Sequence, residues 1–479
     1  MQIAPIALLV GMCLLALGFW LRAPILATLL GSLSFGATAI ASLPAVGGAT
    51  LLLFVPVAGL LVATVAVRRS FRSDLAKVFT LGWPPTIVAL LLVYGVGSAF
   101  IMPRLYAGET TVFIPSSGAI IETTLMPVSG NINQAAYLTL GILTYFALAT
   151  LLVRDARFDA IRAAFFLFAA LNAALGTIDV LGKASGAGDL LQPFRTAGYS
   201  MLVEVQVEGF WRIVGAYSEA STFGAATLIT LAFTFSYWQN TGWRPALLLS
   251  CVLLLLLLLS TSTTGYAGLA ALAACLVVSR VWGFAFGRLQ RRDFLVVSVV
   301  VLLSTAVIGV LLFSERSLEP VEKLIDTTIL QKSTSDSADE RFYWNRKSWQ
   351  AFVDTGGLGV GLGSSRASSS IFAVISQLGV IGAILIALLM VDLARGPDGG
   401  RPQPEHSELA ALCRSLRVTG FAAVIPAAIS GGSADPGILF FIILAALLVG
   451  RKHLATEARI GRHDAAVTYG LGSRGLRTV

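Results

Sequence analysis

Two charged side chains lie beside a long apolar run in the stretch GFWRIVGAYSEASTFGAATLITLAFTF, residues 209–235. Glu219 comes just before the apolar residues, and Arg212 lies seven residues upstream. A carboxylate in this place can act as a general base, and a guanidinium can bind a phosphate through paired hydrogen bonds. Each also has a structural interpretation. With Ser218 as the N-cap, the helix dipole favours a carboxylate in the first turn, and an arginine can extend to lipid headgroups.

A second group of arginines belongs to the stretch STSDSADERFYWNRKSWQAFVDTGG, residues 333–357. Its spacing predicts a helix that begins with Ser337 as the N-cap of a capping box. Two consecutive glycines, starting at Gly356, are expected to end this helix. This helix would present Arg341 and Arg346 to an anion held near the surface of a bilayer. The alternative is that both arginines pair with acidic neighbours in a solvated network.

The composition indicates a membrane protein. Of the 479 residues, 56% are hydrophobic and 13% are charged, with a mean hydropathy of +0.82, whereas soluble domains carry roughly a quarter charged residues. The apolar runs are continuous and long enough to cross about 30 Å of hydrocarbon as helices. We therefore predict an all-α, polytopic bundle with about thirteen spans, although 1–67 could hold a re-entrant piece: 3–21, 23–44, 49–67, 79–101, 135–153, 163–182, 222–237, 245–260, 264–282, 294–313, 370–392, 417–431 and 436–450.

The basic residues orient this bundle. Most of the 34 lysines and arginines fall in alternate loops on one face, which the positive-inside rule assigns to the cytoplasm. The amino terminus is then expected outside and the carboxy terminus inside. The pI near 9.5 follows from this topology and requires no nucleic-acid partner. We expect residues 1–450 to form the transmembrane domain and 451–479 to form a flexible, basic cytoplasmic tail.

Three outer loops, 102–134, 183–221 and 314–369, are too long to be simple connections. The third is expected to carry an amphipathic helix on the membrane surface within 315–333, in addition to the helix that bears Arg341. Its stretch GLGVGLGSSR (357–366) lacks the βαβ context of a nucleotide-binding loop. We interpret these glycines as a pliable re-entry into the membrane.

Other polar residues at the ends of spans can be explained by structural roles. Asp179 is expected close to the membrane surface, where a carboxylate costs little, and Asp435 is expected in a turn between the last two spans. Residues 260–264 (STSTT) either bond backbone carbonyls at a helix end or contact a substrate. The four cysteines lack metal-ligand spacing.

Three segments in order resemble the O-antigen polymerase and O-antigen ligase-like superfamily of bacterial membrane enzymes. They are YSEASTFGAATLITLAF (217–233), LLLLLLLSTSTTGYAGLAALAACL (253–276) and ERFYWNRKSWQAFVDTGGLGVGLGSSRASSSIFAVISQLGVIGAILIAL (340–388). The shared pattern is Ser-Glu-x-Ser opening a helix, a Ser/Thr-rich helix end before a glycine, and an arginine-bearing helix that runs into Gly-Val-Gly-Leu-Gly-Ser. The resemblance covers roughly 205–390.

This resemblance implies a GT-C-like glycosyltransferase of the bacterial inner membrane, active on the periplasmic face. Such enzymes move a glycan from undecaprenyl diphosphate to an acceptor hydroxyl, so the donor is already activated and neither a cofactor nor a metal is expected. The expected partners are the lipid-linked glycan, membrane lipids, a flippase and a chain-length regulator. We expect Glu219, Arg212, Arg341 and Arg346 to be catalytic, and Arg195, Tyr217, Ser218, Ser221, Trp344 and Arg366 to bind the substrate.

Two alternatives stay open. Ligases of this superfamily use a histidine in the large outer loop, whereas all three histidines here (His406, His453 and His463) fall on the predicted cytoplasmic side. That departure favours a polymerase over a ligase. A transporter or flippase of lipid-linked sugars is the alternative from another class, but the chain has no evident internal repeat.

Overall fold

The computed structural model describes residues 2–43, 49–116, 119–198, 201–203, 206–207, 210–285, 336–396 and 407–474. Within these ranges, seven helices are long and apolar enough to cross a membrane, or eight if one bent pair forms a span. The chain is therefore an α-helical membrane protein, while the expected thirteen spans are not confirmed. The seven helices are α5 (Pro84–Leu105), α6 (Ser129–Asp155), α7 (Phe158–Ala184), α8 (Ala220–Thr241), α14 (Ser370–Ala394), α15 (Glu408–Ser430) and α16 (Ile438–Arg474).

Shorter helices complete the described part of the bundle. Three of them, α1 (Pro5–Trp20), α9 (Arg244–Leu259) and α10 (Thr263–Ala285), are apolar over 16 residues each. The bent pair is α3 (Phe54–Ala66) and α4 (Phe71–Phe79), whose axes meet at 103°. The span predicted over 294–313 and the surface helix predicted within 315–333 lie outside the described residues.

The prediction of a span over 23–44 is wrong. Helix α2 (Pro24–Ser32) has only nine residues, and the chain then forms β2 (Ala39–Leu43), which pairs with β1 (Gln2–Ile3) and β3 (Ala49–Leu52). Non-helical backbone is tolerated in a membrane bundle only where protein satisfies its polar groups. That condition is met here by the sheet and by bonds such as Ala37 N–H to the carbonyl of Ala216 (3.0 Å). A re-entrant piece within residues 1–67 stays a prediction.

The buried centre of the bundle is formed by the first half of α16. Nearly every residue from Phe440 to Val449 is buried, and the helix packs against α6 and α15. Close approach to α6 depends on Gly141, since an added Cβ there would lie 2.7 Å from the Phe441 ring. A helix that is apolar on all faces is expected in such a position.

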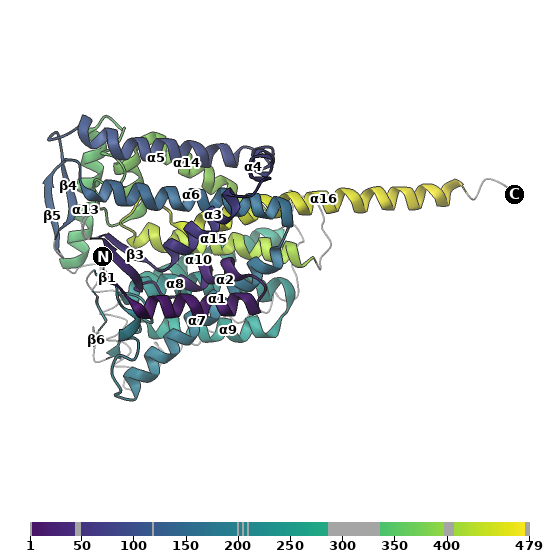
Figure 1. Ribbon diagram of the computed structural model, residues 1–479, viewed down its shortest axis with the longest axis horizontal. Coiled ribbons are helices and arrows are strands. Elements are labelled where there is room, and N and C mark those ends of the chain that lie inside the picture. Colours follow the sequence, from purple (N-terminus) through teal and green to yellow (C-terminus); the bar gives the residue numbers. More distant parts are fainter. Residues whose placement is uncertain are drawn as a thin grey trace.

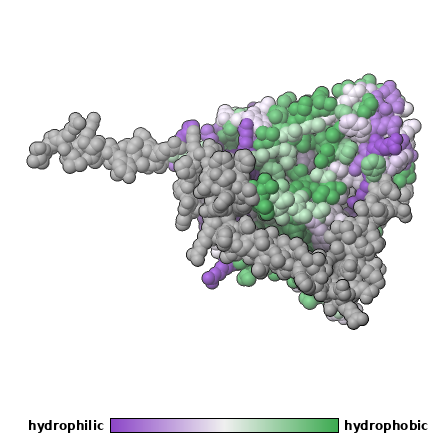
Figure 2. Space-filling view, turned by 180° about the vertical axis from the view of Figure 1, so that it is seen from behind, coloured by the Kyte–Doolittle hydropathy of each residue, from purple (hydrophilic) through white to green (hydrophobic). Residues whose placement is uncertain are grey.

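The outer loops gather at one end of the bundle (Figure 1). The hairpin of β4 (Thr111–Ser116) and β5 (Ala119–Thr124), the short strands β6 (Gln206–Val207) and β7 (Phe210–Trp211), α13 (Asp336–Asp354) and the amino terminus all belong to this end. The carboxy terminus lies beyond the opposite end. Figure 2 shows apolar side chains across the middle of one face and polar ones gathered toward the outer-loop end. The sequence-based placement of the three loops on one side is consistent with this arrangement.

Helix α13 is fixed onto the β4–β5 hairpin. Lys347 Nζ lies 2.9 Å from Glu122 Oε1, and the hydroxyl of Tyr343 donates to Glu122 Oε2 at 3.0 Å. The hydrogen bond from Lys347 lowers the pKa of Glu122. The helix ends at Asp354, before the positive φ of Gly356, as predicted. Ser337, the predicted N-cap, lies within this helix, which is described from Asp336 onward.

The last helix departs from its prediction. Residues from Arg451 onward were expected to form a flexible tail, but α16 continues as a helix through Arg474. Figure 1 shows this part projecting beyond the rest of the bundle. The stretch ARIGRHDAAV contains several alanines and arginines, which are strong helix formers.

The glycine-rich segment after α13 packs its backbone into a break in α14. Gly379 has φ +61° and ψ −161° within that helix, which frees carbonyls on the preceding turn. Val360 N–H donates to the carbonyl of Ser376 (2.8 Å) and Gly361 N–H to that of Gln377 (3.0 Å). The Gln377 side chain also accepts from Gly363 N–H at 2.8 Å. These N–H groups are therefore already used and cannot hold a nucleotide phosphate.

Glycine is required in this segment for two reasons. Gly361 and Gly363 have φ of +95° and +80°, where L side chains are strained. A Cβ added to Gly363 would lie 2.3 Å from the carbonyl oxygen of Gly130, and one added to Gly361 would lie 2.6 Å from that of Ser98. The segment is therefore a tightly packed piece of the bundle and not the pliable one that the glycines suggest, and its re-entry into the membrane stays a prediction.

Candidate functional site

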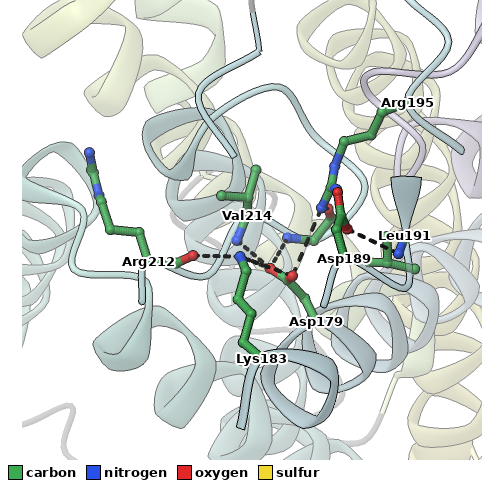
Figure 3. A network of polar contacts seen from close by, with 8 residues as sticks. Asp179, Lys183, Asp189, Leu191, Arg195, Arg212 and Val214 are labelled. Carbon is green, nitrogen blue, oxygen red and sulfur yellow. Dashed lines mark hydrogen bonds and ion pairs between the residues drawn. The ribbon is translucent and has the colours of Figure 1, made fainter. Parts of the chain in front are cut away.

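The backbone around Arg212 is held by a carboxylate near the end of α7. Asp179 Oδ2 accepts hydrogen bonds from Val214 N–H (2.7 Å) and Gly215 N–H (3.0 Å). Lys183, one turn later, contacts Asp179 at 3.0 Å and donates to the carbonyl of Arg212 at 2.7 Å. The side chain of Asp179 is 1% exposed. Asp179 therefore anchors the residues between Arg212 and Gly215 (Figure 3).

A second ion pair extends this network. Arg195 contacts Asp189 through Nη1, donates through Nη2 to the carbonyl of Gly215, and lies 3.9 Å from Asp179. Its side chain is only 3% exposed. Two carboxylates and two cations balance the charge, as buried ions require. We call Asp179, Lys183, Asp189 and Arg195 the anchor network.

The anchor network bears on two predictions. Arg195 was expected to bind substrate, and its position does not support this role, because it is buried and engaged with two carboxylates and a carbonyl. Asp179 was expected close to the membrane surface, and it lies near the end of α7 that faces the outer loops. It is also buried within the protein, where cations and backbone N–H groups compensate the cost of desolvation.

Arg212 lies outside this charge balance. Figure 3 shows its side chain pointing away from Asp179 and Lys183. Its Nη2 makes a long bond of 3.4 Å to the carbonyl of Thr261, and its buried Nε has no partner. Burial lowers the pKa of the guanidinium, and the charge of Glu219 opposes that shift. The group remains a cation at neutral pH, with donors available to an anion.

Glu219 is the N-cap of α8, and the prediction of Ser218 in that position is wrong. The residue has extended φ and ψ of −158° and 161°, and α8 begins at Ala220. Its carboxylate makes no bond to the first-turn N–H groups; Oε1 accepts instead from the hydroxyls of Ser221 and Thr222. No ion pair joins Glu219 to Arg212 in the described part of the chain. Glu219 is half-buried.

Two neighbours of Glu219 have backbone or core roles. The Tyr217 side chain is buried. Its hydroxyl has two acceptors within hydrogen-bond distance, the carbonyl of Leu33 (3.1 Å) and Asn172 Oδ1 (3.2 Å). The prediction that Tyr217 contacts substrate is therefore not supported by its position. Ser218 is half-buried, and its carbonyl accepts from Leu202 N–H at 2.8 Å.

The turn between α9 and α10 connects Arg212 to a second polar group, which includes Thr264 and Ser430. Thr261, whose carbonyl Arg212 reaches, has a positive φ of 47° in the turn between α9 and α10. Three residues on, the hydroxyls of Thr264 and Ser430 are 3.2 Å apart, which links α10 to the end of α15. Ser260, Ser262 and Thr264 thus bond backbone or hydroxyl partners, as expected for helix-end polar groups. The buried hydroxyl of Thr261 has no partner.

Arg366 belongs to this second polar group. Its Nε lies close to the backbone of Gly432, where an added Cβ would be 3.3 Å away. The side chain is exposed, and its own backbone N–H donates to the carbonyl of Phe113 at 2.8 Å. Arg366 therefore lies between the β4–β5 hairpin and the α15–α16 connection.

Asp435 lies in the α15–α16 connection, in a turn as predicted. Its Oδ1 accepts from Gly437 N–H at 3.0 Å, and its own N–H donates to Ser433 Oγ at 3.0 Å. Burial raises the pKa of Asp435 to about 6. A carboxyl group that titrates near neutral pH is common in functional sites, although structural burial has the same effect.

Replacing Asp435 with asparagine is expected to stabilise the protein at pH 8. The folded-state pKa is raised above the unfolded value, so native stability falls as pH rises from about 4 to 6. Asparagine keeps an acceptor for Gly437 without the charge. After allowance for solvent screening, the gain is about 1–2 kcal/mol. Denaturant titrations at pH 4 and pH 8 test this, with exposed Asp159→Asn as control. An equal difference at both pH values would contradict it.

The arginines of α13 are not brought into contact with Arg212 and Glu219. Arg341 and Arg346 are exposed on a helix that packs against α14 and β4, whereas α8 packs against α7, α9, α10 and α15. Trp344 is half-buried, with its ring 5.8 Å from that of Phe113. Both groups of arginines belong to the same end of the bundle.

No protein-family model matches this sequence, and no curated protein matches it either. Among the described residues, no group of three or more His, Cys, Asp or Glu could hold a metal ion.

Proposed function

We propose that the protein is a membrane glycosyltransferase that polymerises undecaprenyl-diphosphate-linked oligosaccharide repeats into an exopolysaccharide or O-antigen. The observation that carries the proposal is that Arg212 and Glu219 lie near enough at one end of a membrane bundle for the charge of Glu219 to act on the guanidinium of Arg212. The buried Nε of Arg212 has no partner, and the anchor network fixes the backbone of residues 212–215. The resemblance of residues 205–390 to polysaccharide polymerases and ligases supports the same conclusion.

The proposed reaction assigns one role to each charge. The acceptor hydroxyl attacks the anomeric carbon of the donor glycan and passes its proton to Glu219. The bond between that carbon and the diphosphate oxygen breaks, and Arg212 stabilises the charge that develops on the leaving diphosphate. Preorganised donors of this kind contribute about 10²–10³-fold in rate, and a general base about 10²–10⁴-fold. The donor is already activated, so the proposed reaction uses no cofactor.

The other polar residues at this end receive roles consistent with their positions. Ser218, Ser221 and the exposed Arg366 are proposed to contact sugar or diphosphate groups. Arg341 and Arg346 are proposed to hold the diphosphate or a growing chain from the side of α13. The proposed location is the bacterial inner membrane with this end in the periplasm, and a flippase and a chain-length regulator are the proposed partners.

Analysis of lipid-linked glycans tests the proposal. Deleting the gene should leave single repeats on the lipid carrier, and purified protein supplied with lipid-linked repeats should form polymer. Full-length polymer retained on the carrier after deletion would instead identify a ligase. Repeats that fail to reach the outer face would identify a flippase.

A further inference from the structure

The corner between α3 and α4 borders an open basic cavity at the end of the bundle opposite Arg212 and Glu219. The 103° bend turns α4 across the direction of its neighbours, and Figure 1 shows this helix nearly end-on. The cavity has a volume of about 530 Å³ and is lined by Arg68, Arg69, Ser70, Arg154 and Asp155. None of these residues takes part in the proposed glycan transfer.

The cavity carries an excess of positive charge. Asp155 is its single acidic lining residue, at 3.5 Å from Arg68 and 3.7 Å from Arg154. Arg154 is held in place by a hydrogen bond to Ser70 Oγ. The nearby Asp74 pairs with Lys77 at 2.9 Å and also lies 3.9 Å from Arg154. Three arginines and Lys77 thus face the two carboxylates Asp155 and Asp74. This excess of positive charge suits the cavity to an anion with several oxygen atoms.

Arg69 has fewer contacts to acidic residues than the other two arginines. It is exposed, and within the described ranges no carboxylate pairs with it. Ser70 is the N-cap of the nine-residue helix α4, so the positive end of that helix dipole also faces the cavity. Guanidinium groups and a helix N-terminus that converge on one cavity favour phosphate.

Exposed apolar side chains flank the cavity. Val67 is 82% exposed and directly precedes Arg68, and Phe79 at the far end of α4 is 41% exposed. The opposite face of α4 packs into the protein through Val78, which is fully buried. An amphipathic helix of this kind lies in the interface of a bilayer. A basic cavity beside exposed apolar residues in a membrane protein fits a lipid headgroup whose acyl chains follow the bundle.

We propose that the α3–α4 corner binds the headgroup phosphate of an anionic membrane phospholipid through Arg68, Arg69 and Arg154. The arginines contact the phosphate oxygens, Ser70 holds Arg154 in place, and the acyl chains lie against Val67 and the apolar surface of the bundle. The site is separate from the proposed glycan-transfer site and does not depend on that function.

Native mass spectrometry of the full-length protein tests this site. The probes are phosphatidylglycerol, phosphatidylcholine and inorganic phosphate, each titrated against purified protein. We expect phosphatidylglycerol to bind at least tenfold more tightly than phosphatidylcholine. The double variant Arg68→Gln/Arg69→Gln should bind phosphatidylglycerol about tenfold or more weakly, because each arginine near an anionic lipid surface strengthens binding several-fold.

A matched variant controls for charge alone. Arg72→Gln/Lys452→Gln removes the same two charges from exposed positions outside the cavity lining, and it should bind phosphatidylglycerol within about twofold of the wild type. Equal losses in the two variants would overturn the site, because only overall charge would then matter. Inorganic phosphate that competes at concentrations similar to the lipid would also overturn it and identify a soluble anion. A similar denaturation midpoint for both variants shows that folding is unaffected.

Discussion

Replacing Asp179 with asparagine is expected to lower the free energy of unfolding by about 3–5 kcal/mol. Removing one partner of a buried ion pair leaves the remaining charges desolvated and unpaired. Here both Lys183 and Arg195 would lose their shared carboxylate in a place where their side chains are 9% and 3% exposed. Asparagine keeps one oxygen for the N–H groups of Val214 and Gly215, so the loss is attributable to charge. Denaturant titration in detergent micelles measures the effect.

Two further variants separate charge from packing. Asp179→Asn/Lys183→Met restores the charge balance and should recover a large part of the lost stability, since a buried pair is often replaceable as a whole. Asp159→Asn changes an exposed carboxylate on the same helix and should cost no more than about 1 kcal/mol. A single Asp179→Asn variant within about 1 kcal/mol of the wild type would show that the anchor network does not stabilise the fold.

The sequence predicts the class of the protein and the grouping of its loops well. Continuous apolar runs distinguish membrane helices from soluble elements, and they recover each of the seven helices long enough to span. They fail at 23–44, because hydrophobicity reports only that a segment is buried. A buried segment can form either a long helix or a short helix followed by a sheet, provided that its backbone N–H and C=O groups find hydrogen-bond partners. Here tertiary contacts such as that with the carbonyl of Ala216 supply some of those partners.

The candidate site is predicted in part for a similar reason. Glu219 is recognisable because a carboxylate directly precedes an apolar run, and Arg212 because it is the nearest upstream arginine. The role of Arg195 depends on Asp179 and Asp189 meeting around it, which is a tertiary contact without a local pattern. The spacing of Asp179 and Lys183, four residues apart on a helix, was an available signal for their ion pair. It could not reveal that both hold the backbone of residues 212–215.

Replacing Arg212 with glutamine is expected to lower the rate of glycan transfer by about 10²–10³-fold. Under the proposed function, the guanidinium stabilises the charge on the departing diphosphate, and glutamine cannot supply that charge. Arg212→Lys keeps a cation but loses the paired donors and should recover only part of the rate. Stability should change little, because the network contacts the carbonyl of Arg212 and leaves its side chain outside. The measurement is polymer formation from lipid-linked repeats by purified protein.

The controls determine whether this effect belongs to the site. Arg104→Gln removes an exposed arginine at the end of α5 and should leave the rate within about twofold. Glu219→Gln should reduce the rate by about 10²-fold or more without a comparable loss of stability, because its carboxylate makes no capping bond to α8. Comparison with Arg341→Gln/Arg346→Gln then shows whether α13 contributes to the same step. Normal polymer from both Arg212→Gln and Glu219→Gln would contradict the assignment, because neither side chain would then be needed for transfer.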